Sequence, residues 1–404
     1  THTFGLGGMA LVLFLVLLGT GLLMIFVYEP TPEGAYKSIL HMQDETLFGS
    51  LIRGVHHWGA NLLIAVAALH LFRVFLTGAF QGVRRSNWLI GLGMMVLILV
   101  SGFTGYLLPW DQVSYWAITV CTEMLGYVPV LGQSLQRLVA GGTEIGAATI
   151  LNFYALHTVV LPLVMIVLMT WHFWRVRLAG GVIVPADRDD GVARAGYVPY
   201  RPNLVEREKA VALVLIAFVI VLAILFGAPL DLPANPGTSP NPVKAPWYFV
   251  GLQELLLHVH PLFAVVVIPS TLMLALIAVA YLPYDGNSTG RWFLSARGRR
   301  MSALAAATAV VFTTAWILVD EWVVDPGGWL PGSAPVVSDG LLPFAVLLAG
   351  VIAFYMSLKK YFSATVSETV QAMFVLFAVS FTVFTVTGVW FRGAGMALMW
   401  PWQI

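Results

Sequence analysis

Long apolar stretches, separated by shorter polar segments, dominate this chain of 404 residues. A helix needs roughly 20 apolar residues to cross a hydrocarbon layer about 30 Å thick. Stretches of that length lie at about 5–28, 54–76, 88–107, 150–174, 208–228, 262–283, 301–319, 341–358 and 369–391. Only helices and closed barrels satisfy their backbones in lipid, and the alternation of roughly ten residues that marks a barrel strand does not occur. The pattern predicts an all-α polytopic membrane protein with nine transmembrane helices.

Positive charges gather on one side of this predicted topology. Sixteen of the 21 Lys and Arg residues fall in the loops that follow even-numbered spans. The other five lie on the opposite side and are Lys37, Arg53, Arg137, Lys244 and Arg392. By the positive-inside rule, the even-numbered loops and the N-terminus are expected to be cytoplasmic, in a bacterial inner membrane. The opposite side is called the outer side below.

Composition agrees with a membrane protein and excludes several kinds of site. Apolar residues make up 59% of the chain and charged residues 10%, against roughly 25% in an ordinary globular protein. The formal net charge of +1 gives no indication of a nucleic-acid partner. Cys121 is the single cysteine, which excludes an internal disulfide, a cysteine-ligated zinc or iron-sulfur site and a CxxCH haem attachment. The sequence begins at Thr1 without a signal peptide, so we expect a processed or incomplete N-terminus.

The loops between the spans predict the domain organisation. The outer segments 108–149 and 229–261 are rich in Pro, Gly and Trp and predict surface helices and a lid. A polar loop follows the fourth span and is the natural boundary between two units. The sequence thus predicts a four-helix domain, a cytoplasmic linker, a three-helix domain with the lid, and two additional helices with a Trp-rich tail, at 1–178, 179–209, 210–325 and 326–404.

Five of the nine histidines lie in two predicted spans, and four of them, all but His57, are spaced as two matched pairs. His56 and His70 are 14 residues apart, and His157 and His172 are 15 apart. At about 100° and 1.5 Å per residue, 14 positions return nearly to the same helix face some 21 Å along the axis, and 15 come within about 60° of it. Each helix therefore presents one imidazole near each side of the membrane. The spacing predicts two bis-histidine haems, His56 with His157 near the outer side and His70 with His172 near the cytoplasmic side.

Glycines and arginines support this interpretation. Four glycines repeat the 14-residue interval on the first and third spans: Gly7, Gly21, Gly91 and Gly105. A macrocycle edge approaches a helix closely only where there is no side chain. Arg53, three residues before His56, and Arg73, three after His70, can carry positive charge toward haem propionates.

Other interpretations of these residues stay open. The histidines could be core residues hydrogen-bonded to carbonyls, the glycines could serve ordinary helix packing, and the arginines could be interfacial anchors. A di-haem membrane anchor of another quinone-linked oxidoreductase also uses intramembrane histidines, but it predicts four or five spans and no outer lid. A secondary transporter would place polar residues at the midplane and carry an internal repeat, and neither occurs here.

Four stretches carry a resemblance to a known family. They are Leu51 to Arg73 (LIRGVHHWGANLLIAVAALHLFR), Gly105 to Trp116 (GYLLPWDQVSYW), Asn152 to His172 (NFYALHTVVLPLVMIVLMTWH) and Pro246 to Phe249 (PWYF). The chain resembles cytochrome b of the bc-type quinol:cytochrome c oxidoreductases over about its first 320 residues. The interval of 15 residues between His157 and His172 resembles the chloroplast-type branch, here with the four-helix part and a subunit IV-like part fused.

The resemblance implies a redox enzyme with defined cofactors and partners. It implies that quinol is oxidised at the outer side, with one electron passed to a Rieske iron-sulfur protein and on to a c-type cytochrome or equivalent acceptor. The second electron would pass through haem bL (His56 and His157) and haem bH (His70 and His172) to a quinone site at the inner side, with proton translocation. It also implies a homodimer within a multi-subunit complex.

The outer quinol motif departs from the family. Much of the family has Pro-Glu-Trp-Tyr where this chain has Ala245-Pro246-Trp247-Tyr248. The glutamate that would accept a quinol proton is therefore absent. Glu254, about two helical turns beyond the motif, is the predicted substitute, and the alternative is a solvated interfacial glutamate. Variants lacking the motif glutamate are often associated with menaquinol, which favours a menaquinone-type substrate.

Three other regions complete the prediction. Gly5 stands where chloroplast-type proteins bind an extra haem through cysteine, so we expect no covalent third haem. Arg177 and the stretch 187–190 lie on the correct side to supply charge and protons to the inner quinone site. The tail 390–402 contains several Trp residues and fits either an interfacial belt or a docking surface for another subunit.

Overall fold

The computed structural model describes residues 5–183, 200–284, 289–323 and 330–403. These residues form helices joined by loops and contain no sheet beyond two isolated β-bridges. Within them, nine helical stretches are long and apolar enough to span a membrane, as the sequence predicts. The stretches are Leu6–Ile25, Gly49–Leu76, Gly82–Leu107, Ala147–Leu178, Arg201–Phe226, Leu262–Tyr281, Ala296–Trp322, Val336–Phe362 and Val366–Trp390.

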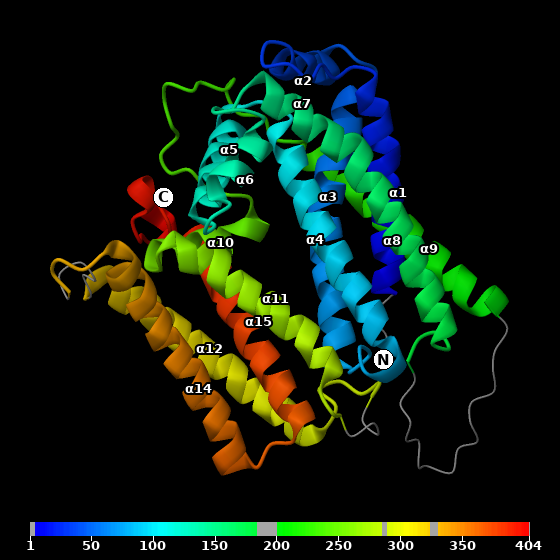
Figure 1. Cartoon of the computed structure of the whole chain (residues 1–404). Coiled ribbons are helices and arrows are strands. Elements are labelled where there is room, and N and C mark those ends of the chain that lie inside the picture. Colours follow the sequence, from blue (N-terminus) through cyan, green and yellow to red (C-terminus); the bar gives the residue numbers. More distant parts are fainter. Residues whose placement is uncertain (1–4, 184–199, 285–288, 324–329, 404) are drawn as a thin grey trace.

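The N-terminal unit is an upright four-helix bundle (Figure 1). Its helices are α1 (Leu6–Ile25), α3 (Gly49–Leu76), α4 (Arg85–Leu107) and a fourth built from α7, η3 and α8 (Ala147–Ala155, Leu156–Val160 and Leu161–Leu178). The helix α2 (Ala35–Asp44) lies across one end of the bundle. By the distribution of Lys and Arg, this end of the bundle is the outer one. The helix α9 (Tyr200–Phe226) packs along α1 and α3.

Three spans contain a π-helical turn directly before a proline. In each, a backbone N–H donates to the carbonyl five residues earlier: Leu161 to Leu156, Ile268 to Phe263, and Leu342 to Val337. The next residue is proline in every case: Pro162, Pro269 and Pro343. Proline cannot donate a hydrogen bond and clashes with the carbonyl four residues before it, and a π turn relieves that crowding while adding one residue to the helix.

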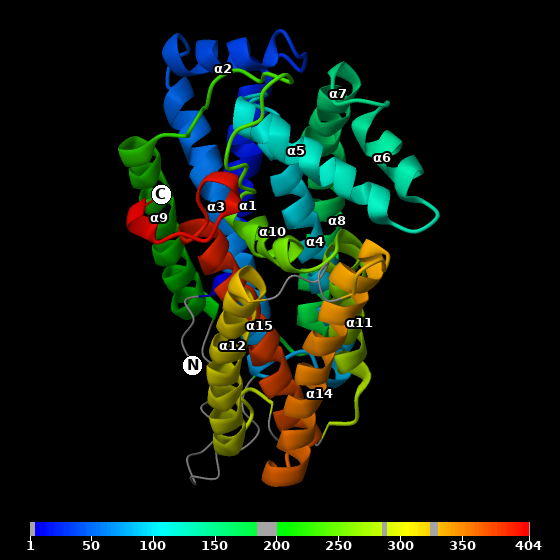
Figure 2. The ribbon, with the colours of Figure 1, turned by 90° about the vertical axis from the view of Figure 1, so that its left-hand side faces the viewer.

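A layer of short helices covers the outer end. It contains α5 (Gln112–Met124) and α6 (Gly132–Ala140). Asp111 caps α5 by accepting from the Ser114 N–H at 2.9 Å, and its other oxygen accepts from the Asp231 N–H at 3.1 Å. The segment after α9 is thereby tied across the outer end. It leads into α10 (Trp247–His258), which lies near the middle of the molecule in Figures 1 and 2.

The C-terminal unit places the last span at its centre. It contains α11 (Ile268–Ala278), α12 (Ala296–Trp322), α14 (Leu342–Phe362) and α15 (Val366–Trp390). Figure 2 shows α15 between α12 and α14. Its Phe374 ring stacks on Phe75 of α3 with centroids 3.9 Å apart, and the Gln371 amide donates to the Phe75 carbonyl at 2.8 Å. The predicted additional helices are therefore not a detached appendage, because α15 contacts the N-terminal bundle directly.

The predicted domain boundaries stay predictions, and part of the linker 179–209 lies outside the described residues. The stretch 187–190, which was predicted to supply charge and protons to an inner quinone site, also lies outside the described residues. The observed spans are longer than the predicted ones at several ends. For example, α12 begins at Ala296 instead of about 301, because charged and amphipathic residues continue the helix beyond its apolar part.

Candidate functional site

The bundle brings the four predicted histidines together as two facing pairs. The rings of His56 and His157 have centroids 6.2 Å apart, and those of His70 and His172 are 6.5 Å apart. Metal–imidazole bonds are about 2 Å long, so one metal atom between two rings needs centroids roughly 6 Å apart. Both pairs have this separation. The rings cross at 68° and 73°, so neither pair is stacked.

The π turn in the fourth helix brings the interval of 15 residues into register with the interval of 14. His157 lies inside this turn, and the turn adds one residue between His157 and His172. The remaining 14 positions advance by the same angle and rise as the 14 between His56 and His70 on α3. The two helices thus present their histidines at matching levels although their spacings differ.

Each predicted glycine faces one of these histidines. A Cβ atom on Gly7 would lie 3.3 Å from the His70 ring, and one on Gly91 would lie 3.6 Å from the His172 ring. At the outer pair, a Cβ on Gly21 would lie 3.4 Å from His56, and one on Gly105 only 2.5 Å from His157. The glycines therefore form a cradle around the two histidine pairs that larger side chains would fill.

The outer histidines are held by hydrogen bonds that fix their tautomers. The Thr20 hydroxyl donates its proton to the Val16 carbonyl at 2.8 Å, so its oxygen accepts from Nδ1–H of His56 at 2.9 Å. Nδ1–H of His157 donates to the Ser101 carbonyl at 3.0 Å. With Nδ1 protonated in both rings, Nε2 keeps the lone pair that binds a metal.

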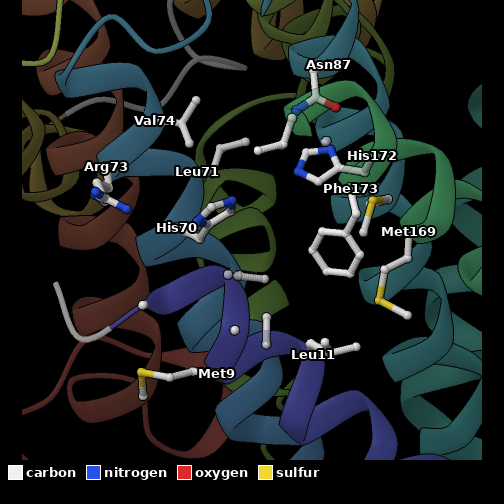
Figure 3. Close-up of a pocket in the computed structure, with 18 of the residues that line it drawn as sticks. Met9, Leu11, His70, Leu71, Arg73, Val74, Asn87, Met169, His172 and Phe173 are labelled. Atoms are coloured by element: carbon white, nitrogen blue, oxygen red, sulfur yellow. The ribbon is translucent and has the colours of Figure 1, made fainter. Parts of the chain in front are cut away.

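The inner pair lines a cavity of about 670 Å³ (Figure 3). His70 and His172 face one another across it, and its wall is largely apolar, with Met169 and Phe173 among its residues. Nδ1 of His70 is buried without a hydrogen-bond partner in the part of the chain that the structure describes. This volume is within the usual range for cofactor sites, and the histidines, glycines and cavity together fit a haem.

The predicted arginines occupy different environments. Arg73 is partly buried and lines the inner cavity. Arg53 is 7% exposed and donates to the carbonyls of Ala228 and Pro229 at 2.8 and 2.6 Å, so it ties α3 to the loop after α9. Arg177 is exposed and is not among the residues that line the cavity.

Several polar residues near the two histidine pairs were not predicted from the sequence. Thr20 and Thr104 each directly precede a glycine that faces an outer histidine, and this repeated Thr-Gly pair was the signal that could have found them. Arg84, Asn87 and Glu208 line the inner cavity, and nothing in their spacing pointed to it.

The aromatic end of α10 lies against the bundle close to the outer histidine pair. The indole N–H of Trp247 donates to Asn61 at 2.7 Å, and Asn61 is about 8 Å along α3 from His56 and about 140° around it. The Tyr248 hydroxyl lies 3.0 Å from the Cβ position of Gly102, one turn from Gly105. Burial, with Tyr106 and Cys121 nearby, raises the pKa of Tyr248, so this phenol stays protonated and can donate a hydrogen bond.

Pro246 is the N-cap of α10, and its carbonyl accepts from the Phe249 and Val250 N–H groups at 2.8 and 3.0 Å. Phe249 packs edge-to-face on Phe103 of α4. The motif therefore starts the helix and turns its first aromatic side chains toward α3 and α4.

Glu254 lies in a buried ion cluster on α10, not at a solvated interface. Its side chain is fully buried, and its oxygens accept from Nε and Nη2 of Arg392 at 2.7–3.1 Å. Burial raises the pKa of Glu254, but the hydrogen bonds from His258 and Arg392 outweigh it and leave the pKa lowered. This environment favours the ionised carboxylate. The predicted role of Glu254 as a proton acceptor stays a prediction.

Comparison with known proteins places these features in a family context. A model of the family described as Cytochrome b/b6/petB matches residues 1–180. The cytochrome b6 of Synechococcus sp. (strain CC9605) is 43% identical over 175 residues, which make up 43% of this chain and 80% of that protein. The cytochrome b6 of Heliobacterium mobile is 44% identical over 175 residues, covering 43% of this chain and 82% of that protein.

A solved structure described as "Hyperthermophilic respiratory Complex III" superposes with a TM-score of 0.70. The alignment covers 94% of this chain and 92% of that chain at 24% sequence identity. At this identity the similarity is one of fold, and it extends beyond the N-terminal bundle into the C-terminal unit.

The π turn can be tested by two deletions that give the same spacing. Deleting Val159, which is 53% exposed inside the π turn, converts that turn to regular helix and keeps His157 and His172 in register. Deleting Val167, which is 65% exposed on α8, turns His172 by about 100° relative to the bundle. We expect the Val159 deletion to keep both haems and the Val167 deletion to lose the inner one, as counted by haem extraction. Equal haem content in the two variants would contradict the role of the π turn.

The glycine cradle can be tested on α4. Gly105→Ala places a methyl group within 2.5 Å of the His157 ring, whereas the Cβ of Gly93→Ala would meet only Leu168, at 4.0 Å. We expect Gly105→Ala to displace the ring and lower outer-haem content several-fold, with Gly93→Ala matching the unmodified protein. The reduced-minus-oxidised absorption spectrum measures both. Identical spectra for Gly105→Ala and Gly93→Ala would contradict the cradle.

Proposed function

The chain belongs to the cytochrome b/b6 family, and on that premise we propose that it is the cytochrome b subunit of a quinol:cytochrome c oxidoreductase. One observation carries the proposal: two facing histidine pairs lie at two levels of one bundle, and an aromatic helix end lies beside the outer pair. A di-haem anchor of another oxidoreductase would need the histidines but not this helix.

The four histidines would hold two b-type haems. His56 with His157 would bind haem bL near the outer end, and His70 with His172 would bind haem bH near the inner end. When bound, the haems would carry single electrons between the two ends of the bundle. The chain itself orients the outer rings through Thr20 and Ser101, so that Nε2 points to the metal. No covalent third haem is expected, since Gly5 stands at the position of the family's cysteine.

The inner cavity supports charge placement at the haem edge. Arg73 lies one turn beyond His70 and lines the cavity, where its charge can face a propionate. Arg53 would act indirectly, since its guanidinium is bound to carbonyls of the loop after α9. Arg177 is proposed, from its position after His172, to supply charge to an inner quinone site. Glu208 and Arg84 add titratable and positive groups to the same cavity.

The outer quinol site would lie between α10 and the bundle. Pro246 starts α10, Trp247 fixes it to α3 through Asn61, and Tyr248 turns its phenol toward α4. A protonated phenol in this position can donate to a quinone oxygen and orient the ring. The absence of the motif glutamate favours menaquinol as the substrate. Glu254 was the predicted proton acceptor, and its buried ion pair supports a different role, argued below.

The proposal includes the setting in which the chain works. The charge pattern supports an N-terminus on the cytoplasmic side, and we place the complex in a bacterial cytoplasmic membrane. A Rieske iron-sulfur protein and a c-type cytochrome, or an equivalent acceptor, would complete the electron path, and the complex would be a homodimer. Residues 1–178 would form the haem domain, 179–209 the linker, 210–325 the quinol-site domain, and 326–404 the added helices.

Replacing one ligand should remove one haem. We expect His172→Leu to halve the b-type haem per chain, to about one, and to stop electron transfer to the inner site while the outer haem stays in place. His57→Leu is the matched control, because His57 neighbours His56 but belongs to neither facing pair. Haem extraction and quinol-dependent cytochrome c reduction by the purified complex check this. Loss of both haems from His172→Leu, or equal loss from His57→Leu, would contradict the assignment.

A further inference from the structure

Helix α10 has two faces with different neighbours. Tyr248 and Phe249 face α4, whereas Gly251 faces Phe381 and Thr385 of α15. Glu254 is three residues beyond Gly251 and about 120° around the helix from Tyr248, but it is seven residues beyond Trp247 and within about 20° of it. It therefore lies toward the α15 side, away from Tyr248 and two turns along the helix from Trp247. Figures 1 and 2 both show α10 lying across α15, with the C-terminal segment beside it.

Arg392 connects the part of α10 that contains Glu254 to the end of the last span, α15. Its side chain is 1% exposed, and it forms a bidentate pair with Glu254. Its third nitrogen, Nη1, donates to Glu321 of α12 at 2.8 Å and to the Met396 carbonyl at 2.9 Å. A planar guanidinium with all its branches paired fixes direction as well as distance. Three segments far apart in the sequence are thus joined at one buried charge.

The remaining charged groups around this pair complete a closed network. His258 of α10 contacts Glu254 through Nε2 at 3.2 Å and Asp320 of α12 through Nδ1 at 2.6 Å. Burial lowers the pKa of His258, but hydrogen bonds to Asp320 and Glu254 outweigh it and raise the pKa above its ordinary value. For Arg392, burial likewise lowers the pKa, and the hydrogen bonds to Glu254 and Glu321 raise it overall. Lys244, which interacts electrostatically with Glu254, donates to the Val389 carbonyl at 3.1 Å.

We propose that Arg392, acting through Glu254, is a positioning residue for the outer quinol site. It ties the later turns of α10 to α12 and to the end of α15, so that Trp247 and Tyr248 at the start of the helix keep their places against α3 and α4. The inference rests on the proposed function, and it makes the last span and its tail part of the quinol-oxidising apparatus. Neither Arg392 nor Glu254 is placed to touch the quinol, because Glu254 lies two turns along α10 from Trp247 and its buried carboxylate is bound by Arg392 and His258.

Because Arg392 and Glu254 form a buried ion pair, the proposal predicts different effects for the single and the double variants. Removing one partner leaves the other as an uncompensated buried charge, whereas removing both leaves neither, since His258 keeps its pair with Asp320 and the Glu321 side chain is 25% exposed to solvent. Arg392→Gln and Glu254→Gln should each displace α10. In the double variant, α10 should return to its original position. A proton acceptor would behave differently, since Glu254→Gln would stay slow whatever stands at position 392.

The experiment compares purified complexes carrying Arg392→Gln, Glu254→Gln, the double variant and Arg392→Lys. A soluble naphthoquinol is the substrate, and cytochrome c reduction is followed across pH. We expect each single Gln variant to raise the KM for quinol on the order of tenfold to a hundredfold, with haem content and the shape of the kcat–pH profile unchanged. The KM of the double variant should return most of the way to the wild-type value. The KM of Arg392→Lys should lie between those of the wild type and Arg392→Gln.

The matched control is Arg297→Gln. Arg297 pairs with Glu368 at 2.7 Å and joins α12 to α15 at the opposite end, but it is about half exposed. The Arg297→Gln variant should leave the KM for quinol unchanged. If a single variant fails to assemble, the proposal requires the double variant to assemble with both haems.

Three results would overturn the inference. These are a wild-type KM for Arg392→Gln, a double variant no better than Glu254→Gln alone, or loss of one limb of the kcat–pH profile in Glu254→Gln. The last two would restore Glu254 as a proton acceptor. Absence of quinol oxidation by the unmodified complex would instead refute the proposed function.

Discussion

Four imidazole rings must stay in two facing pairs inside a bundle whose outer surface is apolar, and the rest of the molecule depends on that constraint. In lipid there is no water to satisfy a ring nitrogen, so another helix must do so or the group bound there must. At the outer pair, Thr20 and Ser101 hold the Nδ1 atoms. The glycines opposite the rings keep the intervening space clear.

The two ends of the bundle differ in ways that suit different tasks. The outer rings are oriented by hydrogen bonds and have the aromatic end of α10 beside them. The inner rings line a cavity that also contains Arg73, Arg84 and Glu208. An oriented pair next to an aromatic site suits controlled electron entry, and a cavity lined by charged groups suits the placement of charge at the edge of the bound group.

The sequence predicted the periodic features and missed those that depend on distant contacts. Nine spans and the pairing of His56 with His157 and of His70 with His172 followed from apolar length and helical period, and the helices and ring pairs of the structure have this arrangement. The π turn was not predictable from spacing, although Pro162 is its local cause. An interval of 15 residues in a regular helix only comes within about 60° of one face.

Long-range ion pairs were beyond the sequence. Glu254 and Arg392 are 138 positions apart, and a charge in an outer loop gives no sign that it will be buried. Likewise, an apolar span at the end of a chain carries no signal of whether it lies outside or at the centre. The contact of Phe374 with Phe75 places α15 at the centre, which is why residues predicted as an addition support the site instead.

Counting haem on the purified, unmodified chain tests the central claim most directly. A pyridine haemochrome assay with a reduced-minus-oxidised spectrum should give two extractable b-type haems per polypeptide, one for each facing histidine pair. A folded sample with none, or with a single haem, would contradict the account and leave one or both pairs to be explained as packing.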